Sequence, residues 1–188
     1  MVDETLAIPD IPDLSGIQDP TSREPFGDGW YEGTIIAKRE LTDRAGNERI
    51  FESDDTPSQA GDSRNIRLQT ELVRQSDGRK LGTNVLINYR PEDLSAETVA
   101  QVTAHMELVK GGAEWGAYFR PFMTLSRLSK LQKIAGVRQL QRNGNGGLDL
   151  QPLYGKKGYF RLAPDDRNPE FKAIKEFRET KPAKAKVL

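Results

Sequence analysis

Residue types suited to binding a polyanion are concentrated between Arg120 and Arg161. This stretch holds nine basic residues against one acidic residue, Asp149, so its net charge is +8 in a chain whose formal net charge is +0. Aromatic residues, from Trp115 to Phe160, flank and interrupt the cations. Cations bind phosphates and aromatic rings stack on bases, and single-stranded nucleic acid offers both. The charge pattern agrees equally well with a solvated basic helix face followed by a core strand.

The candidate binding residues lie where cations and aromatic residues adjoin: at the end of one expected strand, before an expected helix, and at the start of a later strand. We expect nucleic acid to contact Tyr89, Arg90, Trp115, Tyr118, Arg120, Lys156, Lys157, Tyr159 and Arg161. Gly158 lacks a side chain, and we expect it to let a ligand backbone approach closely. An aromatic residue on an alternating strand is more often core, which we expect for Phe122 and Phe160.

Residues for catalysis or metal binding are scarce. The chain has no cysteine, which excludes a disulfide, a thiolate zinc site and a cysteine nucleophile, and its single histidine, His105, excludes a histidine metal cluster. No glycine-rich phosphate-binding loop of the Walker type is present. We assign turn and capping roles to the acidic pairs Asp54-Asp55 and Asp165-Asp166. The sequence therefore predicts a non-enzymatic protein without catalytic residues, metal or cofactor.

Composition predicts a soluble protein. Hydrophobic residues make up 36% of the chain, charged residues 30%, and the mean hydropathy is -0.67. No apolar run approaches the roughly 20 residues of a membrane-spanning helix, and the first residues lack the basic and apolar regions of a secretory leader. We expect a cytoplasmic protein with no membrane partner.

Charge and proline divide the chain into three parts. Residues 1–28 hold four prolines and seven acidic residues against Arg23 alone, a net charge of -6, and predict an acidic flexible arm. Residues 29–178 carry the periodic patterns of a folded domain. Residues 179–188 form a basic tail, which we expect to fray after Phe177.

Hydrophobic periodicity places five strands and two helices in the domain. The alternating segments predict strands at 30–41, 65–75, 83–90, 156–162 and 171–177, with Asp77-Gly78 as a hairpin turn. Ser95 is the expected cap of a first helix, which we expect to end at Gly111-Gly112. Pro121 is the expected first residue of the second helix. Residues 42–64 read as a long exposed loop with a short hairpin around Ile50 and Phe51. This order predicts a mainly β fold with a helical insertion, an OB-fold-like five-stranded barrel with its helices between strands three and four.

Several segments also resemble a known family. They are GWYEGTI, IRLQTELV, DGRKLGTNVLINY, LSRLSKLQKIAGV, LYGKKGYFRL and NPEFKAIKEF. These resemble small phage proteins encoded with replication and recombination genes, OB-fold-like proteins that bind single-stranded DNA. The resemblance implies a single-stranded DNA-binding protein in the host cytoplasm, with replication or recombination proteins as further partners and oligomerisation left open. The loop 42–64 and the basic tail depart from the family, and a virion-associated or host-interaction protein is the alternative.

Overall fold

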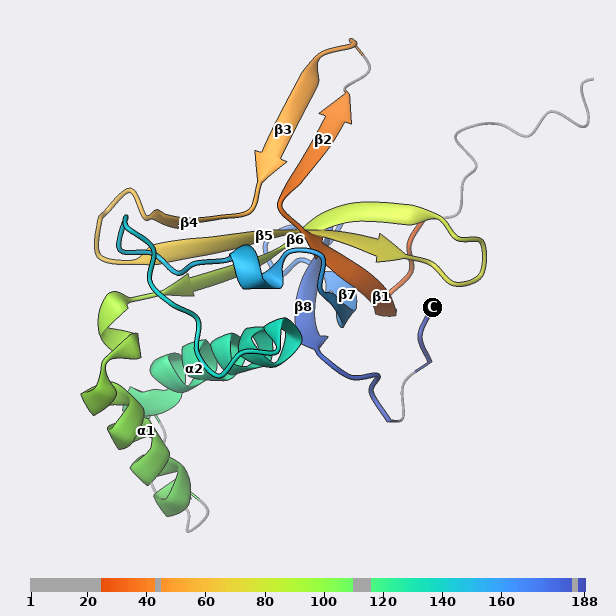
Figure 1. Cartoon of the computed structure of the whole chain (residues 1–188). Coiled ribbons are helices and arrows are strands. Elements are labelled where there is room, and N and C mark those ends of the chain that lie inside the picture. Colours follow the sequence, from red (N-terminus) through yellow and green to blue (C-terminus); the bar gives the residue numbers. More distant parts are fainter. Residues whose placement is uncertain (1–24, 43–44, 110–115, 184–185) are drawn as a thin grey trace, which may run out of the picture.

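The computed structural model describes residues 25–42, 45–109, 116–183 and 186–188, and its main element is an antiparallel sheet (Figure 1). The sheet contains β1 (Gly29–Ile36), β4 (Asp54–Pro57), β5 (Arg64–Val73), β6 (Lys80–Tyr89), β7 (Lys157–Pro164) and β8 (Lys172–Arg178). A separate hairpin of β2 (Lys38–Thr42) and β3 (Glu48–Glu52) projects from the body. The helices are α1 (Ala96–Val109), α2 (Gly116–Ala135) and the short 3-10 helices η1 (Pro91–Leu94) and η2 (Gln151–Leu153).

Strand β5 organises the sheet because both of its edges are paired. Strand β6 pairs along one edge, while β4 and β1 share the other, and β7 and β8 follow β1. The expected alternation is confirmed, since Ile66, Leu68 and Leu72 are buried on one face of β5. The expected turn is confirmed as well, with Gly78 at φ 69° between β5 and β6.

The mainly β architecture with two helices between β6 and β7 is confirmed, but a closed five-stranded barrel is not. The six-stranded sheet curls so that its edge strands β6 and β8 approach each other. In the described part of the chain no hydrogen-bonded pairing joins these two strands. The seam between them stays open, and the segment that connects β7 to β8 lies beside it.

Helix α2 covers the inner face of the curled sheet. Leu128, Leu131 and Ile134 of α2 are buried in one core with the inward residues of the strands. Phe160 belongs to this core, as predicted. Gly158 also faces this core: a Cβ atom there would lie 3.0 Å from the Arg178 carbonyl oxygen and 3.2 Å from Cδ1 of Ile134. The expectation that Gly158 receives a ligand backbone is therefore wrong, because β8 and α2 occupy that space.

The two helices begin at different kinds of residue. The predicted cap of α1 is confirmed, since the Thr98 amide donates to Oγ of Ser95 at 3.1 Å, whereas the predicted stop at Gly111-Gly112 lies outside the described residues. Helix α2 begins at Gly116, so the prediction that Pro121 starts it is wrong. A proline inside a helix removes one hydrogen bond, and α2 keeps its form because the residues after Pro121 are packed on the sheet.

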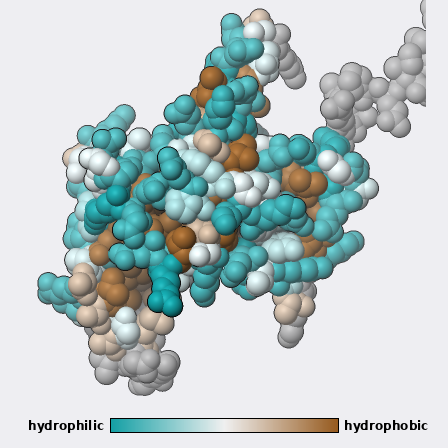
Figure 2. Space-filling view, viewed as in Figure 1, coloured by the Kyte–Doolittle hydropathy of each residue, from teal (hydrophilic) through white to brown (hydrophobic). Residues whose placement is uncertain are grey.

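The segment 42–64 is not the exposed loop that we expected. The hairpin around Ile50 and Phe51 is confirmed, and the guanidinium of Arg39 lies 5.2 Å from the centroid of the Phe51 ring. Strand β4 then pairs with β5, so that only short turns remain. The β2–β3 hairpin leaves Leu41 and Ile50 45% and 58% exposed, and Figure 2 shows hydrophobic residues on it.

Both ends of the described chain pack on β1. Val187 is buried and forms a bridge with Trp30, and the Leu188 amide donates to the Trp30 carbonyl at 2.8 Å. Fraying is therefore wrong for residues 186–188. At the other end Phe26 is buried against Tyr31, while residues 1–24 of the predicted arm lie outside the described residues. Among the described residues no helix is long and apolar enough to cross a membrane.

Candidate nucleic-acid interface

The structure divides the predicted binding residues between two surfaces. On β7 the outward residues are Lys157, Tyr159 and Arg161, which alternate with buried ones. Nζ of Lys157 lies 3.3 Å from a carboxylate oxygen of Glu32, and Arg161 donates a hydrogen bond to Glu176. Two of the cations that we expected to bind phosphate are thus already paired with carboxylates. Lys156, just before β7, is exposed.

The second group surrounds Asp93 in η1, whose side chain is buried. Nη2 of Arg120 lies 2.9 Å from one oxygen of Asp93, and the backbone amide of Arg90 donates to the other at 3.1 Å. Tyr118 stacks on His105 with the ring centroids 4.2 Å apart. These contacts place Arg90, Tyr118 and Arg120 beside the start of α2, on a different element from the β7 residues. Trp115 lies outside the described residues.

Tyr89 is a core residue, and its ring is not available for stacking. It is 1% exposed, and its hydroxyl donates to Oδ2 of Asp55 at 2.7 Å. Burial raises the pKa of Tyr89 well above its ordinary value, and the Asp55 carboxylate raises it further. We predicted that Tyr89 contacts a base. This prediction is wrong, because β6 directs the Tyr89 side chain into the core.

Asp55 is the centre of a buried polar cluster that sequence analysis missed. Its side chain is fully buried and accepts hydrogen bonds from Nε of Arg64 at 2.8 Å and from the Leu148 amide at 2.7 Å. The turn role predicted for Asp55 is wrong, because the residue lies in β4 and joins three segments. Its partners are far apart in the sequence, so no local pattern indicates this cluster.

A groove crosses the outer face of β5 and β6 and was also missed. We call it the β5–β6 groove; it has a volume of about 710 Å³. Its floor and walls are formed by Thr56, Asn65, Ile66, Arg67, Leu86, Ile87, Asn88, Arg127, Asp165, Asp166, Arg167 and Lys175. Four separate parts of the chain therefore meet here: β4, β5 with β6, helix α2, and the segment from Asp165 into β8.

Cations outnumber acids in the β5–β6 groove, and most of them are available to a ligand. Arg67, Arg127 and Arg167 form no ion pair with any residue that the structure describes. Lys175 pairs with Asp166 at 2.7 Å. Oδ1 of Asp165 accepts from the Arg167 amide at 2.8 Å, and this hydrogen bond lowers the pKa of the Asp165 carboxyl. The turn role predicted for Asp165 is confirmed.

Apolar and amide groups complete the groove. Leu86 projects outward from β6 and is 56% exposed. Beside it Nδ2 of Asn88 donates to Oδ1 of Asn65 at 3.0 Å. Nη1 of Arg127 donates to the Leu86 carbonyl at 3.4 Å, which holds the guanidinium over the edge of β6. The groove thus combines one exposed leucine and a pair of asparagine amides with four cations and two acidic residues.

A smaller pocket of about 220 Å³ extends the groove along α2. It shares Asn88 and Arg127 with the groove and adds the partly exposed side chains of Phe119 and Met123. Arg120 also lines it. One of the predicted binding residues is therefore next to the groove, together with an exposed aromatic ring.

The described residues contain no group of three or more histidine, cysteine or acidic side chains that could hold a metal ion. No family model, curated protein or solved structure matches the chain. The function is therefore argued from the groove itself.

Proposed function

We propose that the chain is a non-enzymatic protein that binds single-stranded DNA in the β5–β6 groove. The observation that carries this proposal is the convergence of Arg67, Arg127, Arg167 and Lys175 around the exposed side chain of Leu86. Cations on separate elements can follow the phosphates of an extended strand, while the exposed Leu86 side chain and the Phe119 ring of the adjoining pocket can contact the faces of unstacked bases. Duplex DNA keeps its bases stacked and offers no such faces.

The strand order supports an OB-fold-like assignment for the sheet. β1 lies between β5 and β7, the helices precede β7, and β8 returns beside β6. In OB-folds the second and third strands, with the loops that precede strand two and strand five, bind oligonucleotides. The corresponding elements here are β5, β6, the segment that holds β4, and the 165–171 loop. These are the elements that line the β5–β6 groove.

The biological setting is proposed from the resemblance. We infer that the protein belongs to a bacteriophage and acts in DNA replication or recombination in the host cytoplasm, where it covers single strands. Phosphate contacts supply most of the affinity in such binding, and stacking tolerates every base. We therefore expect little sequence preference.

Fluorescence anisotropy with labelled oligo-dT at two salt concentrations tests the proposal. We expect the logarithm of the association constant to fall with the logarithm of salt by about 0.7 for each neutralised phosphate. An oligo-dA and a labelled oligo-U measure base and sugar preference. Absence of binding at low salt, or an affinity that does not change with salt, contradicts the proposal.

The alternative is a protein-binding module, and the projecting β2–β3 hairpin is the observation that favours it. Leu41 and Ile50 expose large apolar side chains on a two-stranded element, which is marginally stable by itself. This alternative predicts no binding to oligo-dT. If the virion partner is a second copy of the chain, self-association should decrease when Leu41→Ser and Ile50→Ser are combined, as measured by sedimentation velocity.

A further inference from the structure

One sequence motif has no part in the proposed DNA binding. Residues 8–14 read Ile-Pro-Asp-Ile-Pro-Asp-Leu, so an apolar residue recurs at every third position, and proline and aspartate follow each of the two isoleucines. A polyproline II helix has three residues per turn. In that conformation Ile8, Ile11 and Leu14 would form one apolar ridge, and Asp10 and Asp13 would form an acidic ridge beside it.

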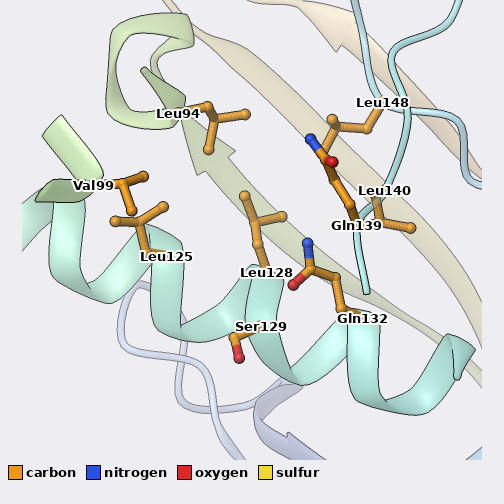
Figure 3. A pocket seen from close by; sticks show the side chains of 9 residues that line it. All are labelled: Leu94, Val99, Leu125, Leu128, Ser129, Gln132, Gln139, Leu140 and Leu148. Carbon is orange, nitrogen blue, oxygen red and sulfur yellow. The ribbon is translucent and has the colours of Figure 1, made fainter. Parts of the chain in front are cut away.

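An apolar pocket of matching size lies between α2, the η1–α1 segment and the chain that follows α2 (Figure 3). Its volume is about 210 Å³, and its walls include Leu94, Val99, Leu125, Leu128, Leu140 and Leu148. Apolar cavities of about 150 Å³ hold a benzene-sized group. The pocket therefore has room for one branched aliphatic side chain together with part of a proline ring.

One side of the pocket is polar in a way that suits a proline-rich peptide. The side-chain amides of Gln132 and Gln139 and the hydroxyl of Ser129 all line this side of the pocket (Figure 3). The backbone carbonyls of such a peptide accept hydrogen bonds, although its prolines donate none. The two glutamine amides can donate to these carbonyls.

The charge around the pocket complements the acidic ridge of the motif. Lys133 follows Ser129 by four residues on α2, which places both on one helix face, and Arg138 precedes Gln139. Both cations are exposed and form no ion pair with the described residues. They are placed to attract Asp10 and Asp13.

The chain is long enough for the motif to reach the pocket of its own molecule. The described residues begin at Pro25, which shares a pocket with Lys80 at the start of β6. Strand β6 runs for ten residues, about 33 Å, from there to Tyr89, and η1 follows at Pro91. Ile11 lies 14 residues before Pro25, and 14 extended residues span about 46 Å.

We propose that residues 8–14 bind in the pocket formed by α2, η1–α1 and residues 139–148, with Ile11 as the central apolar contact. This proposal is independent of DNA binding, because the pocket lies outside the β5–β6 groove and shares no residue with it. The motif of a second copy is the competing occupant, and the experiment distinguishes the two.

The absence of cysteine allows a clean test in the full chain. A nitroxide spin label attached through Ser15→Cys would be next to the motif and would be the only label on the protein. We expect loss of the methyl resonances of Leu94, Leu128 and Leu148 in the labelled protein and their return after reduction of the label. Combining Ile8→Ser, Ile11→Ser and Leu14→Ser should restore these resonances, whereas Ile17→Ser, outside the motif, should not.

A pocket variant and a mixed sample complete the design. Val99→Gln changes a pocket residue that is 40% exposed, so the fold should tolerate it, and it should restore the same resonances. Mixing isotope-labelled protein without the nitroxide with unlabelled protein carrying it reports contacts between molecules. The proposal is overturned if the pocket resonances persist in the spin-labelled chain, if the triple variant leaves the loss unchanged, or if the loss appears in the mixed sample.

Discussion

Replacing two groove arginines should change the salt dependence of DNA binding by a calculable amount. The perturbation is Arg67→Ala combined with Arg127→Ala, which removes the cations of β5 and α2 and leaves Arg167 and Lys175. Neither changed residue forms an ion pair with the described chain. Burial raises the pKa of Asp54, and Arg67, opposite it on β5, counteracts that rise, but Asp54 is only half-buried and water can solvate its charge when Arg67 is lost. The expected effect is therefore on binding and not on folding.

The magnitude follows from counting phosphates. Lys175 is paired with Asp166, so we count the three groove arginines that form no ion pair with the described chain. If each neutralises one phosphate, the log–log slope is about -2.1, and the double variant should show about -0.7. A fourfold rise in salt, from 50 to 200 mM, should then weaken binding about 18-fold in the natural chain and about 3-fold in the double variant. Anisotropy titrations with oligo-dT at four salt concentrations measure both slopes.

A matched variant on β7 separates the two candidate surfaces. Lys157→Ala with Arg161→Ala also removes two cations, but both are paired with Glu32 and Glu176. We expect the slope of this variant to stay near that of the natural chain. The opposite result, an unchanged slope for the groove variant and a reduced one for the β7 variant, would refute the assignment of the groove and favour the surface around Tyr159. Circular dichroism melting confirms that each variant is folded.

Three further predictions concern stacking, packing and pH. Phe119→Ala should weaken binding by about 1–3 kcal/mol without changing the salt slope, because an exposed ring beside the groove can stack on a base. Gly147→Ala should destabilise the fold by about 1–3 kcal/mol in urea unfolding, because overpacking displaces neighbouring atoms. The new Cβ would lie 2.5 Å from Nη2 of Arg64, beside the Arg64–Asp55 pair. The control is Gly144→Ala, whose Cβ meets nothing within 4 Å and which should not change stability. A hydrogen bond from Arg74 lowers the pKa of Asp77 to about 2. The natural chain should therefore be more stable than Asp77→Asn above the ordinary pKa of 3.8, and this difference in unfolding free energy should disappear as pH falls toward 2. A constant difference between pH 6 and pH 2 would contradict this.

Most of the sheet could be predicted because its strands alternate clearly. The inward residues of β5, such as Ile66 and Leu68, are separated by polar ones, and the Asp77-Gly78 turn supplies the left-handed glycine that a tight hairpin needs. Ser95 indicated the start of α1 for a similarly local reason. The start of α2 was missed because Pro121, a common first residue of helices, here lies inside the helix.

The candidate site could not be predicted because it depends on which segments meet. Arg67 and Leu86 are outward residues of two strands, and only the pairing of β5 with β6 places them opposite each other. Arg167 and Lys175 come from a distant segment that lies beside the open seam. The dense run of cations between Arg120 and Arg161 drew attention instead, although its strand members are partly neutralised by carboxylates on β1 and β8.

Asp55 connects the groove to the rest of the molecule. It lies in β4, next to Thr56 on the wall of the β5–β6 groove, and it accepts the amide hydrogen of Leu148 on the wall of the apolar pocket. Removing one member of a buried charged pair costs about 3–5 kcal/mol, because the partner is left without compensation. The Asp55 carboxylate therefore holds two neighbouring walls in place: β4 beside the β5–β6 groove and Leu148 in the apolar pocket. Both surfaces therefore depend on the same cluster for their shape, although they share no lining residue.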